Sequence, residues 1–404
     1  MKKIAIISLG YMWFPCESGT SRFFYIANLF HENGYEVEVI TTSFQHFEKK
    51  PRNQELILSQ GYPFQIVFID APAYKKNIDI RRVYSNKVAE RNLRKYLNLH
   101  VKEYDAVYTS IPANNIAAMV TTVCKKNHVP CVLDIEDLWP EAMAMVVKNE
   151  KLRNLLFHGF LKDAEIAYAN CSAVIGTSED YTARAFKYNK RDIPHETVYV
   201  GCDIEAFDAG VKEYQDSIVK PDDEFWVTYA GSISTSYDIK TLILAANELL
   251  KRGETKIQFQ LLGTGSQKVE LESFVKEQDI KNVRFWGFVP YPKMCAVLSK
   301  SDVLVNSFVK GAPQSIVNKI GDYLAAGKPI INTLENPNFC KLIEENEVGI
   351  NVEPENVNEM RHIIESMYEN SSNFNKNARC LAETHFDRRR TFDFILNLVK
   401  CVFD

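Results

Sequence analysis

The stretch FWVTYAGSISTSYDIKTLILAANELLKRGETKIQFQLLG, residues 225–263, decides the fold class. It opens with an apolar, β-rich run at 225–231, continues as a helical pattern at 238–252 and ends in a second apolar run at 256–263. Near-continuous apolar strands separated by a helix are typical of a parallel sheet that is covered on both faces. This stretch therefore predicts one strand-helix-strand unit.

The same alternation extends in both directions along the chain. After this unit we expect strands and helices at 266–278, 283–289, 302–308, 316–326 and 329–333. Before it we expect them at 4–9, 20–33, 36–42, 65–70, 80–102, 106–110, 114–127, 129–135, 151–169 and 172–178. The alternation pauses in a polar stretch at 207–225, which favours a domain boundary there. The sequence predicts an α/β protein of two doubly wound parallel-sheet domains, 1–207 and 222–385.

Composition narrows the class of protein. The 404 residues are 46% hydrophobic, enough for two cores, and the net charge of -4 gives no bulk attraction to nucleic acid. The apolar run in the first ten residues is too short for a secretory signal, and nine scattered cysteines favour reduced thiols. We expect a cytoplasmic protein without a membrane-spanning helix.

Loops that follow strands are the expected ligand sites, because doubly wound sheets bind ligands at the carboxyl ends of their strands. The first such loop carries Gly19 just before a helix, where backbone N–H groups could approach an anionic or polyol ligand. A plain turn, with Ser18 or Thr20 capping the helix, explains the same residues. The dinucleotide fingerprint is absent, which argues against NAD.

A cluster of carboxylates follows the buried strand at 129–135. Asp134, Glu136, Asp137 and Glu141 surround Trp139. Such carboxylates could bind sugar hydroxyls, act as a base or hold a metal, and the absence of a nearby histidine disfavours the metal.

In the second half, Gly231 and Ser232 follow one strand and Gly263 follows the next. Both loops precede helices, so they could cradle a diphosphate or could be simple tight turns. The segment 309–333, VKGAPQSIVNKIGDYLAAGKPIINT, places Lys319 and Asp322 on one helix face. These two residues could form a surface ion pair, or could divide a phosphate and a ribose between them.

At this segment the chain resembles the family-4 retaining glycosyltransferases of the GT-B fold, particularly the bacterial cell-surface polysaccharide branch. The matching motifs in the first half are the loop at Ser18 and Gly19, DLWPEA at 137–142, SAVIGTSE at 172–179 and VGCDIEAF at 200–207. In the second half they are YAGSIS at 229–234, LLGTG at 261–265, VRFWGFVP at 283–290, SDVLVNS at 301–307 and NKIGDYLAAGKPII at 318–331.

The resemblance implies a donor site on the second domain. Asp322 would hold the donor ribose, Gly231 and Ser232 would approach the diphosphate with Gly263 beside them, and the backbone of Phe288, Val289 and Pro290 would frame the base. Gly19 would lie near the diphosphate, and residues 386–404 would form a helix that packs on the first domain. The usual diphosphate-clamping arginine and lysine are missing after Gly231, so Lys319 would supply that charge.

The resemblance also implies the chemistry. The donor would be a UDP-sugar, anomeric configuration would be retained and no metal or other cofactor would be required. The first domain would bind the acceptor, with Glu136 and Asp137 orienting hydroxyls; Glu136 stands where the family has a histidine. Gln314 replaces the family's glutamate that touches the donor sugar. The transferred sugar could therefore be a hexosyl or an N-acetylhexosaminyl group.

The acceptor is inferred from a basic segment and from the family branch. Residues 73–102 are basic and partly amphipathic, which suits either an anionic membrane surface or a solvated helix. A saccharide acceptor, lipid-linked through a polyprenyl diphosphate at the inner face of the membrane, would fit capsule, O-antigen or exopolysaccharide synthesis. Two rivals stay open: a sugar-nucleotide epimerase or hydrolase, and a non-catalytic binder of nucleotide sugars.

Overall fold

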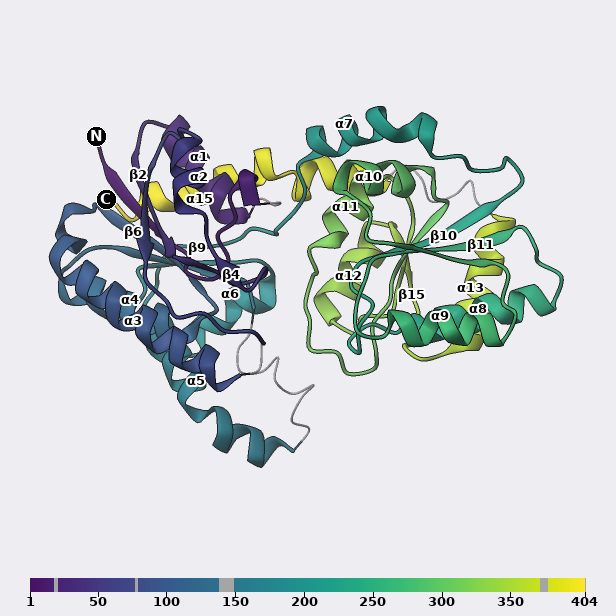
Figure 1. The fold of residues 1–404 in the computed structure, drawn as a ribbon, viewed down its shortest axis with the longest axis horizontal. Coiled ribbons are helices and arrows are strands. Elements are labelled where there is room, and N and C mark those ends of the chain that lie inside the picture. Colours follow the sequence, from purple (N-terminus) through teal and green to yellow (C-terminus); the bar gives the residue numbers. More distant parts are fainter. Residues whose placement is uncertain (18–20, 77–78, 138–148, 371–376, 404) are drawn as a thin grey trace. The chain divides into compact units, whose positions relative to one another are not determined.

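The computed structural model describes residues 1–17, 21–76, 79–137, 149–370 and 377–403. The chain forms two compact units (Figure 1). Unit 1 comprises Met1–Val198 together with Phe392–Asp404, and unit 2 comprises Tyr199–Thr391. Each unit is built on a parallel sheet, so the predicted α/β class with two doubly wound parallel sheets is confirmed.

Unit 1 contains a seven-stranded parallel sheet in the order β5-β2-β1-β6-β7-β8-β9. Its strands are β1 (Lys3–Ile7), β2 (Glu36–Thr42), β5 (Gln65–Ile69), β6 (Ala106–Ile111), β7 (Cys131–Ile135), β8 (Ala173–Gly176) and β9 (His195–Thr197). A short antiparallel hairpin, β3 (Phe44–Gln45) with β4 (Lys50–Pro51), follows β2. The strand order reverses direction between β1 and β6, which makes the loops after these two strands the topological switch point.

Helices cover both faces of the unit 1 sheet because alternate strand residues point to opposite sides. Ile4 and Ile6 belong to one core cluster, and Ala5 and Ile7 belong to another. The helices are α1 (Arg22–Glu32), α2 (Gln54–Ser59), α3 (Ile80–His100), α4 (Asn114–Lys126), α5 (Glu150–Asn170) and α6 (Glu179–Phe186). The N-cap of α1 is Ser21, whose side chain accepts a hydrogen bond from the N–H of Phe24.

Unit 2 contains a six-stranded parallel sheet in the order β12-β11-β10-β13-β14-β15. Its strands are β10 (Phe225–Ala230), β11 (Ile257–Leu262), β12 (Val283–Gly287), β13 (Val303–Asn306), β14 (Ile330–Asn332) and β15 (Gly349–Asn351). Here the order reverses between β10 and β13, so the loops after these strands flank the switch point of unit 2.

Two helical layers cover the unit 2 sheet, with α8, α9 and α13 gathered on one side and α10, α11 and α12 on the other (Figure 1). The helices are α7 (Ile204–Tyr214), α8 (Ile239–Lys251), α9 (Lys268–Glu277), α10 (Tyr291–Lys300), α11 (Lys319–Ala325), α12 (Pro337–Glu345), α13 (Val357–Glu369) and α14 (Asn377–Leu381). The polar stretch at 207–225, where the alternation pauses in the sequence, begins inside α7.

The last helix, α15 (Arg388–Cys401), starts in unit 2, and its residues from Phe392 onward belong to unit 1. Phe392, Ile395 and Val399 are buried in the same core cluster as Ile4 and Phe23. At its start, Arg388 donates side-chain hydrogen bonds to the carbonyls of Val200 and Gly201. Among the helices that the structure describes, none is long and apolar enough to cross a membrane.

Candidate functional site

Two glycines at the carboxyl ends of the neighbouring strands β10 and β11 have conformations that side chains disfavour. Gly231, with φ +151°, follows β10, and Gly263, with φ +135°, follows β11. A Cβ atom on Gly263 would lie 1.8 Å from the carbonyl oxygen of Gly231, so a side chain does not fit there. The N–H of Gly231 donates to Leu262 and that of Gly263 to Gly287. These glycines therefore allow a ligand to come close to the backbone, but their own N–H groups are already hydrogen-bonded within the sheet.

Lys319, the first residue of α11, lies beside these glycines. A Cβ atom on Gly231 would be 3.7 Å from the Lys319 Nζ, and the neighbouring Ser232 carbonyl accepts a 2.7 Å hydrogen bond from the Tyr229 hydroxyl. The predicted residues Gly231, Ser232, Gly263 and Lys319 thus gather at one end of the unit 2 sheet.

Four aromatic rings form a cage around the Lys319 ammonium group. Its Nζ lies 4.2 to 5.8 Å from the ring centroids of Tyr229, Tyr237, Phe308 and Tyr323. The nitrogen is buried and has no hydrogen-bond partner among the described residues. Burial lowers the pKa of Lys319 to about 7. Aromatic faces attract the cation but do not replace the hydrogen bonds it has lost, so the cage suits an anion that can reach the nitrogen.

Asp322, one turn further along α11, has a different environment. Its Oδ1 accepts a 2.8 Å hydrogen bond from the Tyr291 hydroxyl. Burial raises the pKa of Asp322 to about 6, while that hydrogen bond and the charge of Arg388 oppose the rise. Tyr291 begins α10 directly after Phe288, Val289 and Pro290, of which Phe288 is 78% exposed. Asp322 therefore lies beside the predicted base-framing loop.

The other predicted residue of unit 2 is Gln314, which lies half-buried in the loop between β13 and α11. Gly19 falls outside the described residues, as does Glu141 of the carboxylate cluster. Sequence reasoning did not find Tyr229, Phe308 and Tyr323 of the cage or Tyr291. These four aromatic residues lie in strands, helices or adjoining loops, where a sequence pattern does not distinguish a ligand contact from core packing.

In unit 1, Glu136 and Asp137 follow β7 as predicted, but the carboxylates of the cluster differ in role. Asp134 is fully buried and accepts hydrogen bonds from Arg22 at 2.7 Å and Tyr108 at 2.6 Å. The Glu136 Oε1 atom is buried without a partner among the residues that the structure describes. Burial, reinforced by Asp134, raises the pKa of Glu136 to about 8. Asp134 is thus structural, whereas Glu136 keeps a neutral carboxyl at neutral pH.

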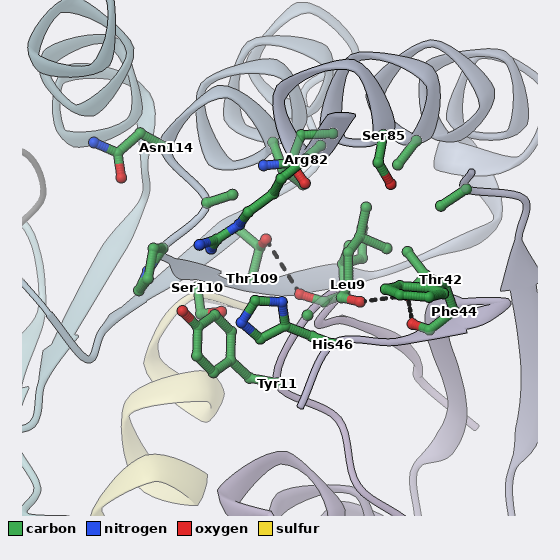
Figure 2. Close-up of a pocket in the computed structure, with 18 of the residues that line it drawn as sticks. Leu9, Tyr11, Thr42, Phe44, His46, Arg82, Ser85, Thr109, Ser110 and Asn114 are labelled. Carbon is green, nitrogen blue, oxygen red and sulfur yellow. Dashed lines mark hydrogen bonds between the residues drawn. The ribbon is translucent and has the colours of Figure 1, made fainter. Parts of the chain in front are cut away.

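A pocket opens at the switch point of unit 1, lined by the loops after β1 and β6, the hairpin strand β3 and the helix α3 (Figure 2). Its empty volume, open solvent at the mouth included, is about 790 Å³. Tyr11, His46, Arg82 and Ser110 reach toward this space. Burial, with Arg82 and Lys49 nearby, lowers the pKa of His46 to about 3, so its imidazole is neutral.

Tyr11 links this pocket to the carboxylates after β7. Burial raises the pKa of Tyr11 well above its ordinary value, with Glu136 the next contributor, so its hydroxyl stays protonated. Within the described part of the chain, no group of three His, Cys, Asp or Glu side chains is arranged to hold a metal ion.

Comparison with known proteins connects these sites to a family. Residues 224–370 match the family described as Glycosyl transferases group 1. The chain is also 28% identical over 153 residues to WcaI of Escherichia coli (strain K12), whose name proposes a glycosyl transferase of colanic acid biosynthesis. That match covers 37% of this chain and 37% of WcaI.

Solved structures resemble the whole chain. Sucrose-phosphate synthase from Thermosynechococcus elongatus has a TM-score of 0.74 at 18% identity, covering 100% of this chain and 99% of its own. Anabaena HepE in complex with UDP has a TM-score of 0.71 at 16% identity, covering 99% and 100%. WaaG, a glycosyltransferase of lipopolysaccharide biosynthesis, has a TM-score of 0.66 at 14% identity, covering 97% and 99%. Identities this low establish the fold alone.

The matched segment contains the paired glycines, the caged Lys319 and Asp322. Residues 224–370 are therefore similar to the group 1 glycosyltransferases, in a chain that has the GT-B fold.

Proposed function

We propose that this protein is a glycosyltransferase that moves a sugar from a nucleotide donor, a UDP-sugar, to a saccharide acceptor. The buried Lys319 ammonium carries the proposal. It lies in an aromatic cage beside two glycines that allow close approach, at the edge of the sheet where doubly wound folds bind ligands. A diphosphate would supply the anionic partner that the described cage lacks.

Solved relatives support UDP as the nucleotide. HepE has been solved in complexes with UDP and with UDP-glucose. In this chain we assign Asp322 to the ribose hydroxyls and the backbone of Phe288 to Pro290 to the base. Gly231, Ser232 and Gly263 would border the diphosphate, and Gln314 would contact the donor sugar. No metal is needed in this scheme because Lys319 supplies the positive charge.

The proposed chemistry is a retaining transfer in which the leaving diphosphate accepts the acceptor's proton on the same face of the sugar. A positioned charge stabilises the leaving group as negative charge develops on it. Lys319 provides that charge once the diphosphate raises its pKa. Glu136 and Asp137 would orient sugar hydroxyls, and the raised pKa of Glu136 leaves its carboxyl able to donate as well as accept a hydrogen bond.

For the acceptor we propose a lipid-linked saccharide at the inner membrane face, in bacterial surface polysaccharide synthesis. Helix α3 supports this because Ile80, Val83 and Tyr84 are 84%, 45% and 62% exposed near its N-terminus, beside Arg81 and Lys87. Exposed apolar residues flanked by basic ones suit an anionic bilayer surface. Sedimentation with anionic and neutral liposomes tests this, and equal sedimentation with both would contradict it.

Thermal denaturation with UDP, GDP, ADP and CMP, without added metal, tests the donor site. A ligand present at about 100 times its dissociation constant stabilises a protein by roughly 2.7 kcal/mol. We expect a selective rise with UDP that is lost in Lys319→Met. A response to none of the nucleotides would contradict the proposal, and turnover of a UDP-sugar without an acceptor would favour an epimerase or hydrolase.

A further inference from the structure

Arg388, at the start of α15, is bonded to the segment 199–203 through both its backbone and its side chain. Its N–H donates to the Cys202 carbonyl at 3.0 Å, and its guanidinium donates to the carbonyls of Val200 at 2.9 Å and Gly201 at 3.0 Å. All of these residues belong to unit 2. The three hydrogen bonds fix the backbone of the segment relative to the guanidinium.

The same segment lies directly against α11, the helix that carries Lys319 and Asp322. A Cβ atom on Gly321 would be 2.7 Å from the carbonyl carbon of Gly201 and 2.9 Å from the backbone nitrogen of Cys202. The two backbones therefore touch with no side chain between them. Asp322 directly follows Gly321, and the charge of the guanidinium that holds the segment acts on the Asp322 carboxyl.

We propose that Arg388 is a positioning residue of the ribose site, which keeps α11 against the segment 199–203 and holds Asp322 as a carboxylate. The inference rests on the proposed function, in which Asp322 accepts the ribose hydroxyls, and deepens it by naming the group that keeps this acceptor charged. An ionised carboxyl accepts hydrogen bonds with both oxygens, whereas a protonated one gives up part of that capacity. Arg388 acts through Asp322 rather than on the ligand.

The uncharged groups around Asp322 are phenols and thiols. Its carboxylate accepts a 2.8 Å hydrogen bond from the Tyr291 hydroxyl. The other groups that sense its charge are Cys202, Cys295 and Tyr323. Burial, with the charge of Asp322 contributing, raises the pKa of all four groups, so they are neutral at neutral pH. Burial also raises the pKa of Asp322 to about 6, and the Tyr291 hydrogen bond and the charge of Arg388 oppose that rise.

Charged groups on the other elements around α11 have interactions of their own. Arg379 of α14 forms ion pairs with Asp208 and Glu383. The Asp387 carboxylate accepts a backbone N–H at the start of α15, and the Lys319 ammonium faces its aromatic cage. Each of these charges is thus engaged within its own surroundings.

The pH dependence of UDP binding to the full chain tests the proposal. Calorimetry between pH 5 and pH 8 should show the affinity of the wild type falling as pH drops through 6, because Asp322 takes up a proton. Arg388→Gln removes a positive charge, so the pKa of Asp322 rises and the same fall should occur at a pH higher by about half a unit or more. At pH 8 the two proteins should bind UDP within about twofold of each other, because the carboxyl is ionised in both.

Three further variants separate the charge of Arg388 from its contribution to the fold. Arg388→Lys keeps the charge and should keep the wild-type pH profile, even if the thermal midpoint falls with the loss of the guanidinium fork. Arg389→Gln removes the same charge one residue away, from an exposed side chain that pairs with Glu205, and should also keep the profile. In an Asp322→Asn background, Arg388→Gln should no longer shift the profile. Protonation of UDP itself is common to all variants, so the differences between them report on the protein.

An unchanged profile in Arg388→Gln, an equal shift in Arg389→Gln, or a shift that persists without the Asp322 carboxylate would overturn the inference. If Arg388→Gln does not fold, Arg388→Lys decides instead: a wild-type profile supports the inference, and a displaced profile in a variant that keeps the charge contradicts it. UDP binding with any of the contrary results refutes only the role of Arg388. No UDP binding at any pH refutes the proposed function.

Discussion

Arg22 in unit 1 and Lys319 in unit 2 are both buried cations at the start of a helix, yet their environments are opposite. The Arg22 guanidinium lies 2.7 Å from the Asp134 carboxylate, which also accepts a hydrogen bond from the Tyr108 hydroxyl. Lys319 is surrounded by aromatic rings, with no carboxylate bonded to it in the described structure. Although burial opposes it, the carboxylate raises the pKa of Arg22, whereas burial alone lowers that of Lys319.

The difference separates a structural cation from a functional one. A buried charge is tolerated when a partner offsets the lost hydration, and Arg22 has that partner within the fold. Burial removes the hydration of the Lys319 ammonium, and no carboxylate in the described structure offsets that loss. Such an uncompensated buried charge is typical of residues that act on a ligand.

The largest effect should be a loss of stability on removing Arg22, the cation of the buried pair in unit 1. Arg22→Leu leaves the Asp134 carboxylate buried without its cation, so the free energy of unfolding should fall by about 3–5 kcal/mol. Urea denaturation measures this. A variant as stable as the wild type would show that the pair contributes nothing net, and Arg22 would lose its structural role.

Removing the unit 2 cation should affect turnover instead. Lys319→Met should lower kcat/KM by about 10²–10³-fold, the range reported when one transition-state stabilising donor is lost. Its thermal midpoint should be unchanged or higher because an unpaired buried charge disappears. Lys328→Met, just beyond the same helix, is the control and should retain activity. If Lys319→Met keeps full turnover, the assignment of Lys319 is wrong.

The third effect is a proton taken up on UDP binding. With its pKa lowered to about 7, Lys319 is mostly neutral at pH 8, and a bound diphosphate would raise that pKa and recharge it. Binding at pH 8 should therefore consume close to one proton, and affinity should fall as pH rises above 7. Calorimetry in buffers of different ionisation enthalpy measures the uptake. Persistence of the uptake in Lys319→Met would assign the proton to another group.

The sequence predicted the fold well because its signal is local. Apolar runs such as 225–231 and 256–263 became β10 and β11 with small shifts at their ends. The sequence analysis missed β9 and β15, strands of three residues each that are too short to show a period. It also missed three longer helices, α7, α12 and α13.

The candidate sites were only partly predictable. Gly231, Ser232, Gly263 and Lys319 gather as predicted because all lie at strand ends or helix starts of one sheet edge. The prediction that Lys319 and Asp322 act on one ligand stays untested; in the structure Lys319 contacts the cage and Asp322 contacts Tyr291. The cage and the unit 1 pocket join residues far apart in the chain, which single-sequence patterns cannot bring together.

The smallest effect should be on the affinity for UDP when Asp322 is replaced. It distinguishes a carboxylate that contacts the ribose from one that only stabilises the fold. A carboxylate that accepts a ribose hydroxyl should strengthen UDP binding by about tenfold, the size of a typical hydrogen bond to a charged group. Asp322→Asn should therefore weaken UDP binding about tenfold, while the thermal midpoint without ligand changes little. The pKa of the half-buried Asp322 carboxyl is raised to about 6, so the same loss should appear in the wild type as pH falls through 6.

Deoxynucleotides complete the test. If Asp322 contacts the 2′-hydroxyl, the wild type should bind 2′-deoxy-UDP about tenfold more weakly than UDP, and Asp322→Asn should bind the two alike. The 3′-deoxy analogue makes the same comparison for the other hydroxyl. If Asp322→Asn discriminates against both deoxynucleotides as strongly as the wild type does, the carboxylate does not touch the ribose. Its bond to Tyr291 would then only anchor α10 against α11 within unit 2, a packing role that the ligand does not sense.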